Sequence, residues 1–241
     1  MPGFVDLHCH WIAGIDDGAP TPEAGLELLS GLKRLGFEHV VATPHMRPGM
    51  FDNSKADLVR AFDAMAPHLA SRPELPRVSL SSEHYFDDIV FRRLLDGSGL
   101  PYPGGHAALL EFYEIDFPPT VEHRFFELLQ RGVLPVIAHP ERYRVLWSKP
   151  ERLERLVDKG AAALLDAAAL VGKYGRKPQR CAEQLLESGL YHAACSDAHR
   201  PGDVEEVAAG MRRIEKLYGA DEIEFLFSDG PRALLEGRLP E

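Results

Sequence analysis

The sequence contains little cysteine and no long apolar run. Its three cysteines, Cys9, Cys181 and Cys195, are odd in number, widely spaced and without a Cys-x-x-Cys pattern, which speaks against a disulfide framework or a structural zinc knuckle. No run of about 18 apolar residues occurs, and no basic segment followed by an apolar one opens the chain. We therefore expect a cytoplasmic protein that is not embedded in a membrane.

An excess of basic residues is also missing. The chain has 37 acidic and 27 basic residues, a net charge of -10. Nucleic-acid binding depends largely on clustered Lys and Arg, so we expect no nucleic-acid partner. The phosphate-binding loop G-x-x-x-x-G-K-[S/T] is absent as well, which makes a P-loop nucleotide hydrolase an unsuitable interpretation.

The cysteine spacing excludes one further enzyme class. A cysteine-based tyrosine phosphatase needs an arginine six positions after its cysteine, so that a thiolate lies below a phosphate cradle. The residues six positions after the three cysteines are Ile15, Glu187 and Pro201. That mechanism is therefore excluded.

Short runs of Val, Ile, Leu and Ala recur along the chain, and each is followed by a helical pattern. The seven predicted strands are Phe4–Leu7, Val40–Ala42, Val78–Leu80, Ala107–Leu110, Leu134–Ala138, Ala161–Leu165 and His192–Cys195. Continuous apolar character is typical of parallel strands covered on both faces, and the helices provide the crossovers. For 241 residues this predicts a single α/β domain over residues 1–241, either a barrel or a doubly wound sheet.

Several local signals mark the helices. Two apolar stripes at helical spacing predict core-facing sides, at Leu58, Phe62, Met65 and Leu69 and at Val207, Met211, Ile214 and Leu217. Thr21 before a proline predicts a helix start, and Ser148-x-x-Glu151 predicts a capping box. Gly189 and Gly219 lie where helices should end.

Metal-binding residue types follow six of the seven predicted strands. In chain order they are His8 and His10 with Asp16 and Asp17 after them, His45, Glu83, Glu111, His139, and finally Asp197 and His199. The carboxyl ends of parallel barrel strands open onto one face, so these side chains are expected to converge. His8 and His10 point to the same side of a strand and can share one cation. A single histidine is more often a core group than a ligand, but the whole set is hard to attribute to chance.

The chemistry of this set indicates the metal. With one of Asp16 and Asp17 counted, five imidazoles and four carboxylates suit manganese, iron or zinc rather than thiolate-bound metals, and we expect Mn²⁺ first. Nine ligands exceed the needs of one ion, so two or three ions are predicted. Three divalent cations bring about +6 and four carboxylates about -4, which leaves a charge matched to a phosphate dianion. Phosphoester substrates are therefore favoured.

The strand-end motifs resemble those of the PHP (polymerase and histidinol phosphatase) superfamily. The matching segments are Asp6–His10, Gly14–Gly18, Ala42–His45, Ser82-Glu83, Leu110–Phe112, Ala138–Tyr143 and Ser196–His199. The Asp-Asp-Gly loop and the segments His45–Phe51 and His139–Tyr143 further resemble bacterial manganese-dependent protein-tyrosine phosphatases. These accompany the tyrosine kinases of capsule and exopolysaccharide export.

The resemblance implies a distorted (β/α)7 TIM-like barrel, the PHP fold, with a trinuclear site. The ligands carried over by motif are His8, His10, Asp17, His45, Glu83, Glu111, His139, Asp197 and His199. Glu83 is expected to bridge ions. Asp16 could replace Asp17, since only the motif alignment distinguishes the two.

Two arginines follow predicted ligands closely and complete the expected catalytic set with His199. Arg142 and Arg47 could each hold a phosphate through paired hydrogen bonds, or form ordinary ion pairs instead. Phe51 and Tyr143 are candidates either for contact with a substrate ring or for core packing. The chain departs from the family pattern at residues 166–169, Asp-Ala-Ala-Ala, and after His199, where Arg200 could replace an expected arginine.

The predicted function is therefore that of a metal-dependent phosphoric monoester hydrolase, a protein-tyrosine phosphatase of the non-cysteine type. A metal-bound hydroxide would attack phosphorus in line. The expected substrate is a phosphotyrosyl protein, and the resemblance suggests the tail of a bacterial tyrosine kinase. Alternatives are a small-molecule phosphatase such as one for histidinol phosphate, and a non-catalytic metal-binding partner module. An amidohydrolase commonly needs a carboxylated lysine at a strand end, and none is found there.

Overall fold

The computed structural model describes residues 3–240. The described strands are β1 (Phe4–Cys9), β2 (Phe37–Ala42), β3 (His45–Met46), β4 (Arg77–Leu80), β5 (Glu83–Tyr85), β6 (Ala107–Glu111), β7 (Leu134–Ala138), β8 (Ala162–Asp166) and β9 (Ala193–Cys195). The α-helices are α1 (Pro22–Arg34), α2 (Lys55–Ala64), α3 (Ala66–Ala70), α4 (Asp88–Asp96), α5 (Val121–Gln130), α6 (Glu151–Val157), α7 (Arg176–Glu187), α8 (Asp203–Tyr218), α9 (Ala220–Glu224) and α10 (Gly230–Leu235). Short turns η1 (Pro140–Arg142), η2 (Arg144–Trp147) and η3 (Ala167–Val171) are 3₁₀, and η4 (Phe225–Asp229) is a π-helical turn.

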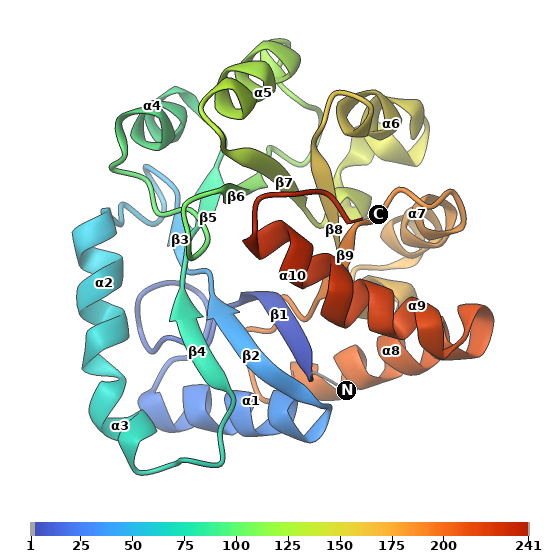
Figure 1. Cartoon of the computed structure of the whole chain (residues 1–241). Coiled ribbons are helices and arrows are strands. Elements are labelled where there is room, and N and C mark those ends of the chain that lie inside the picture. Colours follow the sequence, from blue (N-terminus) through green and yellow to red (C-terminus); the bar gives the residue numbers. More distant parts are fainter. Residues whose placement is uncertain (1–2, 241) are drawn as a thin grey trace.

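The strands form two parallel sheets around which the helices are arranged (Figure 1). One sheet has the order β1-β2-β4, and the other has the order β3-β5-β6-β7-β8-β9. Each crossover between neighbouring strands contains helix or loop on the outside, as parallel pairing requires. The predicted α/β class is thus confirmed, and all seven predicted apolar runs lie in or overlap strands.

The two sheets enclose a common interior, although their hydrogen-bond ladders are separate. On one side β2 continues into β3 and β4 into β5 after short breaks. On the other side, the His10 amide donates to the carbonyl of Ala198 and the Asp197 amide donates to the carbonyl of His8, both at 2.9 Å. The arrangement is a distorted barrel rather than one continuous ladder.

Two of the predicted strands are interrupted, which corrects the expectation that His45 and Glu83 end the second and third strands. His45 starts β3 and Glu83 starts β5, and these residues face each other in the second sheet. Pro44 has no amide hydrogen, so the β2 ladder cannot pass through it. The break shifts both side chains toward the second sheet.

The core has two layers. The larger cluster packs between the sheets and the outer helices, and a smaller one fills the interior with Leu7 and Val41 from one sheet and Val136 from the other. Tyr102 and Leu234 of α10 close this interior, and the Tyr102 hydroxyl donates to the carbonyl of Leu7 at 2.9 Å. Apolar packing therefore seals the amino end of the barrel.

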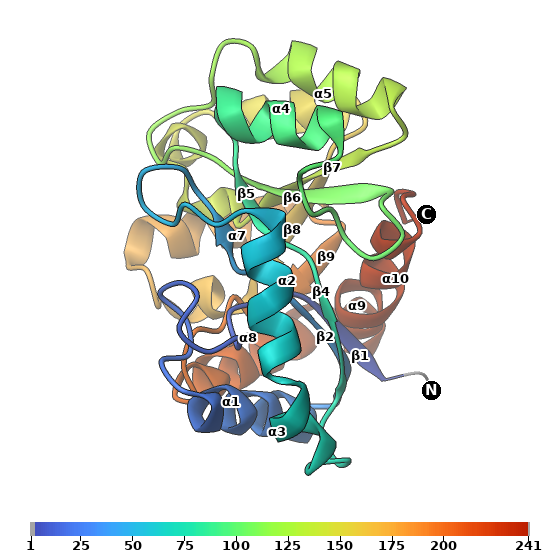
Figure 2. The same cartoon turned by 90° about the vertical axis from the view of Figure 1, so that its left-hand side faces the viewer.

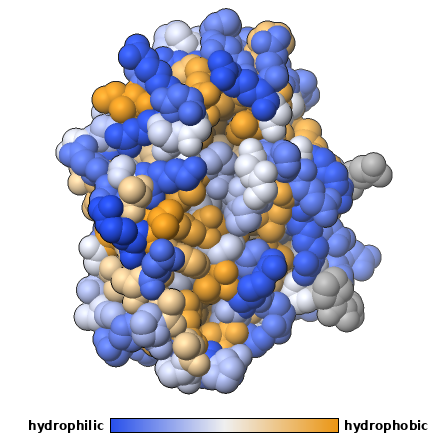
Figure 3. Space-filling model, turned by 60° about the vertical axis from the view of Figure 1, so that its left-hand side comes forward, coloured by the Kyte–Doolittle hydropathy of each residue, from blue (hydrophilic) through white to orange (hydrophobic). Residues whose placement is uncertain are grey.

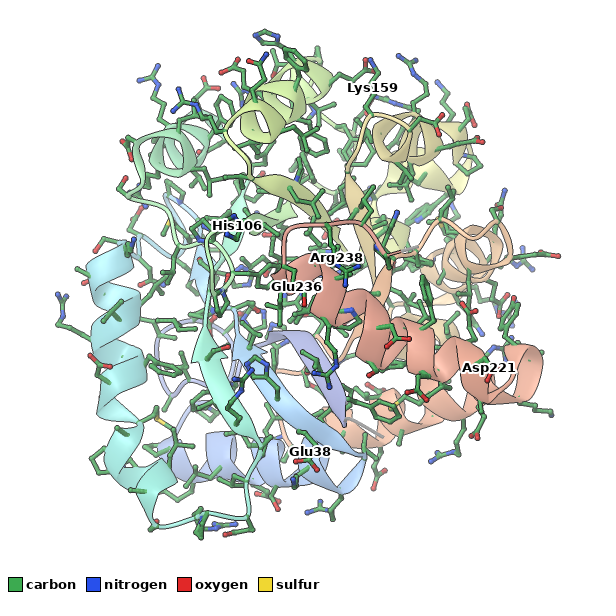
Figure 4. All side chains as sticks on the ribbon, viewed as in Figure 1. Glu38, His106, Lys159, Asp221, Glu236 and Arg238 are labelled. Carbon is green, nitrogen blue, oxygen red and sulfur yellow. The ribbon has the colours of Figure 1, made fainter. Side chains whose placement is uncertain are left out.

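The two ends of the barrel carry different structures. Figure 2 shows α10 on the right and the loops after β1 and β3, in shades of blue, on the left. Figure 4 shows His106, Glu236 and Arg238 near the centre of the face closed by α10. Gly237 makes the last turn there with φ of 74°, and a Cβ at this position would meet the His106 backbone and Cβ. Loops with polar residues thus remain at the opposite, carboxyl end.

The helix signals are mostly confirmed. The Thr21 hydroxyl accepts from the Ala24 amide at the start of α1, and Gly189 and Gly219, both with positive φ, follow α7 and α8. The predicted capping box at Ser148 is wrong: α6 begins after Pro150 and lacks a side-chain cap bond. Leu217 is 57 % exposed, so the second stripe ends one turn early.

The surface carries few large apolar groups. Figure 3 shows hydrophobic residues in separate groups bordered by hydrophilic ones on one face. Within residues 3–240, no helix combines the length and apolarity that crossing a membrane requires.

Candidate metal centre

All nine predicted ligands lie together at the carboxyl end of the barrel. They form four overlapping groups whose ligand atoms lie within 4.8 Å of one another. These groups are His8, His10 and Asp197; His8, Glu83 and His139; His45, Glu83 and Glu111; and His10, Asp17, His45 and His199. Shared members link the groups into one continuous cluster.

Glu83 lies at the centre of the cluster. Its Oε2 atom is 3.2 Å from His8 Nε2, 3.5 Å from His10 Nε2 and 3.0 Å from His45 Nδ1, while Oε1 is 2.9 Å from His139 Nε2. Burial opposes its negative charge, but the histidines around it hold the Glu83 pKa well below its usual range. The two oxygens therefore face different histidines.

His8 and His10 face each other across an unusually short gap. Their Nε2 atoms are 3.1 Å apart, and Asp197 Oδ1 lies 3.2 Å from the first and 3.6 Å from the second. Burial disfavours a charged His8, yet Glu83 and Asp197 raise its pKa. Two imidazole nitrogens and a carboxylate oxygen that converge in this way match the donor set of a divalent cation.

The outer group lies closer to solvent. Asp17 Oδ1 is 3.4 Å from His45 Nε2 and 3.6 Å from His199 Nε2, and the Asp17 side chain is 55 % exposed. Hydrogen bonds from these histidines lower the Asp17 pKa. The His199 ring stacks on His10 with centroids 4.1 Å apart. This group therefore forms the entrance side of the cluster.

The neighbouring aspartate has a different position. Asp16 Oδ2 accepts hydrogen bonds from His10 Nδ1 at 2.8 Å and from the His45 amide at 3.1 Å, and Oδ1 accepts from the Gly18 amide. It thereby contacts the far ring nitrogen of His10, as carboxylates behind metal-binding histidines do. Asp16 orients the cluster, whereas Asp17 faces it.

The donor atoms fit divalent cations. Burial and the neighbouring Glu83 raise the Glu111 pKa to about 7, and Glu111 Oε2 is buried without a hydrogen-bond partner. The set contains only nitrogen and oxygen atoms, because Cys9 points away and its thiol donates to the carbonyl of Ala198. Buried carboxylates and imidazoles without enough partners are stabilised by cations of the manganese, iron or zinc type.

Two ligand candidates have strained backbones. Among the described residues, only His139 (φ 31°) and Asp197 (φ 42°) combine a side chain with positive φ. Such conformations cost on the order of 1–3 kcal/mol each and persist where the surrounding structure holds them. His139 directly follows β7, and Asp197 lies between β9 and α8. The turns at these two places aim both side chains into the cluster.

The cluster forms the floor of a cavity of about 270 Å³ that Arg142 and Arg47 also line. Arg142 donates to Asp197 Oδ2 at 2.7 Å and lies over the Tyr174 ring, 4.6 Å from its centroid. Arg47 lies 4.3 Å from the Tyr85 centroid, and its Nη1 is 3.6 Å from a Glu111 oxygen. Both guanidiniums therefore border the metal cluster in fixed positions.

Apolar side chains form the rim of this cavity. Phe51 stacks on the His45 ring with centroids 5.1 Å apart, and the exposed side chains of Met50 and Tyr113 also line the cavity. Tyr143, the other aromatic candidate, is a core residue: it is 1 % exposed and its hydroxyl donates to the carbonyl of Ala138. Arg200 is exposed and is not among the residues that line the cavity.

Sequence reasoning missed two supporting residues. Asp6 is buried and accepts from the Ser196 hydroxyl at 2.5 Å and from the His8 amide at 3.2 Å, which ties β1 to the segment after β9. Asp6 lies two residues before His8 in the sequence, and this spacing could have indicated its supporting role. Tyr174 supports Arg142 from a distant part of the chain and carried no signal.

The departure at residue 166 lies behind the site. Asp166 is buried, its Oδ1 accepts from the Ala168 amide, and burial raises its pKa to about 7. Its own amide donates to Glu141 Oε1 at 3.0 Å, while Tyr191 donates to Oε2 of the same carboxyl. This segment therefore leaves the nine clustered residues in place.

The chain is similar in sequence to known proteins over nearly its whole length. The chain is 29 % identical to the tyrosine-protein phosphatase YwqE of Bacillus subtilis over 98 % of this chain and 92 % of that protein. It is 26 % identical to the tyrosine-protein phosphatase CpsB of Streptococcus pneumoniae over 98 % of this chain and the whole of that protein.

The structural match is similarly extensive. A solved chain from a study of YwqE and CpsB, described there as unique metal-dependent tyrosine phosphatases, superposes with a TM-score of 0.88 at 28 % identity and covers 98 % of this chain and 96 % of that one. An Escherichia coli phosphotriesterase homology protein at 12 % identity, TM-score 0.56, shares the fold alone, covering 95 % of this chain and 97 % of that one. The family model for capsular polysaccharide synthesis, CpsB/CapC, matches residues 4–236, and the chain belongs to this family.

Proposed function

We propose that this protein is a metal-dependent protein-tyrosine phosphatase that uses the nine clustered residues as metal ligands. The observation that carries the proposal is one cavity whose floor is a His/Asp/Glu cluster, whose wall holds Arg142 and Arg47 and whose rim is apolar. That combination suits a phosphate dianion attached to an aromatic ring. The relatives named as tyrosine phosphatases support the same activity.

The ligand assignment follows the clustered donor atoms. The proposed ligands are His8, His10, Asp17, His45, Glu83, Glu111, His139, Asp197 and His199, with Glu83 as the bridging group. Two or three bound divalent ions, Mn²⁺ by preference, would supply Lewis-acid chemistry and activate water at this cluster. Asp16 and Asp6 hold the first strand's histidines in place from behind.

The remaining steps belong to side chains around the cavity. Arg142 and Arg47 bind the phosphoryl oxygens and neutralise the charge that develops on them. Phe51, Met50 and Tyr113 contact the substrate ring. His199, which is 24 % exposed, lies on the solvent side as a proposed ligand, and water there would supply the proton to the departing phenolate. A phenolate is a good leaving group, so the reaction depends only weakly on this proton transfer.

The proposed substrate is a phosphotyrosyl protein in the cytoplasm, with the tyrosine-rich tail of a capsule-system kinase as the specific candidate. The cavity opens at the loop face of the barrel, where a mobile tail could present its phosphotyrosine. The family's role in capsular polysaccharide synthesis supports this choice.

Hydrolysis assays on purified protein, stripped with chelator and reloaded with Mn²⁺, Fe²⁺ or Zn²⁺, test the proposal. We expect Mn²⁺ to restore turnover of a phosphotyrosyl peptide. His139→Ala should lower kcat/KM at least about a hundredfold, since even residues behind metal ligands contribute 10–100-fold. His123→Ala is the matched control because His123 is exposed on α5.

Other outcomes would redirect the assignment. Preference for histidinol phosphate over the peptide would make the protein a small-molecule phosphatase. Stoichiometric metal binding without turnover of either compound would favour a non-catalytic module.

A further inference from the structure

A second cavity, of about 360 Å³, lies between η2 and α7, outside the metal centre. Its charged lining consists of Arg144, Lys177 and Arg180, and the described lining residues include no carboxylate. Trp147 and the buried Cys181 also line it. We call this cavity the basic groove. Three cations without an acidic partner in the lining are unexpected in a chain with a net charge of -10.

The amino end of α7 places these cations in an unusual position. The other described helices of eight or more residues, α1, α2, α4, α5 and α8, each carry an acidic residue in the first turn. The first turn of α7 contains none and begins with Arg176 and Lys177. Positive charge at this end is unfavourable for the helix dipole. The arrangement therefore adds to the positive potential of the groove instead of stabilising the helix.

The cations of the groove are available for a ligand. Among residues 3–240, neither Lys177 nor Arg180 has a carboxylate within 4.0 Å, and Arg144 has only Glu114, at 3.7 Å. Lys177 Nζ lies 5.3 Å from the centre of the Trp147 ring. The indole donates to the carbonyl of Glu141, which fixes the ring as a wall of the groove. The groove thus offers two free cations beside a fixed aromatic surface.

The groove and the proposed active site are linked by a short stretch of backbone. Glu114 lines the metal cavity, and the Arg144 amide donates to its carbonyl at 2.7 Å. Arg142 in the metal cavity and Arg144 in the groove are separated by one residue. One extended polypeptide can therefore reach both places.

We propose that the basic groove binds an acidic segment of the substrate polypeptide while its phosphotyrosine occupies the metal cavity, an inference that rests on the proposed function. Lysine and arginine bind carboxylates, with arginine able to make paired hydrogen bonds. Nucleic acid fits less well because three cations are few and the rest of the molecule is acidic. The groove would select phosphotyrosines by their flanking sequence and would leave the chemical step unchanged.

Steady-state kinetics with matched peptides test this role. All the phosphotyrosyl peptides share the residues next to the phosphotyrosine. One peptide is neutral, and each member of a series carries an acidic block at a different distance before or after the phosphotyrosine. p-Nitrophenyl phosphate reports on the chemical step alone. The test variant is Lys177→Glu/Arg180→Glu. The control is Arg212→Glu/Lys216→Glu, an equal charge change on the second half of α8, where both side chains are exposed.

We expect the native protein to have a KM about tenfold lower for the best acidic peptide than for the neutral one at low salt, because complementary charge strengthens encounter and binding. The α7 variant should lose this preference and keep its kcat on p-nitrophenyl phosphate, and the α8 control should retain the preference. Salt at about 1 M should remove it as well. An unchanged preference in the α7 variant, or an equal loss in the control, would overturn the proposal.

Direct binding separates this inference from the proposed function. If no phosphopeptide is hydrolysed, the phosphatase assignment fails, but fluorescence anisotropy with an unphosphorylated acidic peptide still tests the groove. Weaker binding to the α7 variant than to the control supports the groove, and equal binding to both overturns it. Equal melting temperatures would show that both variants are folded.

Discussion

The two ends of the barrel differ in what they bury: the amino end buries apolar side chains, and the carboxyl end buries charged and polar ones. The amino end is closed by Tyr102 and Leu234, which are almost fully buried, and the Tyr102 hydroxyl donates to a backbone carbonyl. The carboxyl end buries four cluster histidines and several carboxylates, of which Glu111 Oε2 has no hydrogen-bond partner. One end contributes stability, and the other buries polar atoms of which several lack a partner within the protein.

The comparison also explains where strain is found. Within residues 3–240, the two positive-φ residues with side chains, His139 and Asp197, both lie at the carboxyl end. Strained backbone and adjacent carboxylates such as Glu83 and Glu111 reduce stability at that end. The apolar interior and the α10 closure offset this cost, so a functional site can tolerate it.

Truncating the closure should have the largest effect on stability. Leu234→Ala removes a fully buried side chain from the barrel interior, and we expect a loss of about 2–5 kcal/mol in the free energy of unfolding. Urea denaturation in the presence of chelator measures it, with the exposed Leu217→Ala as control. Activity per folded molecule should stay native, and a selective loss of kcat would show that the two ends are not separate.

Metal should change the stability of the carboxyl end by a similar amount. At a free Mn²⁺ concentration about 100 times Kd, linkage predicts about 2.7 kcal/mol of added stability. Thermal unfolding across a Mn²⁺ titration measures it. The gain should persist in Leu234→Ala and disappear in His139→Ala. If the gain were equal in His139→Ala, the ions would be bound elsewhere.

The sequence predicted the convergence of side chains better than the path of the chain. His8, Glu111 and His139 follow apolar runs, and parallel strand topology alone brings such positions to one face. The breaks before His45 and Glu83 were not visible, because pairing with a second sheet is a long-range property that local apolar runs do not encode. Pro44 was the one local hint.

Other errors have local causes. Ser148 matched a capping-box spacing, but Pro150 starts the α6 turn with its fixed φ, so the serine lies outside the helix. The closure by Leu234 was missed because α10 is a short helix without a repeated stripe. The choice between Asp16 and Asp17 depends on side-chain direction in a loop, which spacing cannot give.

That choice leads to the smallest predicted effect. Asp16→Asn keeps an oxygen near His10 Nδ1 but removes the charge behind the imidazole. Carboxylates in this position contribute about 10–100-fold to metal affinity, so we expect a Mn²⁺ Kd weakened by that factor in isothermal titration, with little change in chelator-treated stability. Asp17→Asn should weaken the Kd further and reduce the number of bound ions, because Asp17 faces His45 and His199 directly. The opposite order would make Asp16 the ligand and would mean that the loop rearranges when metal binds.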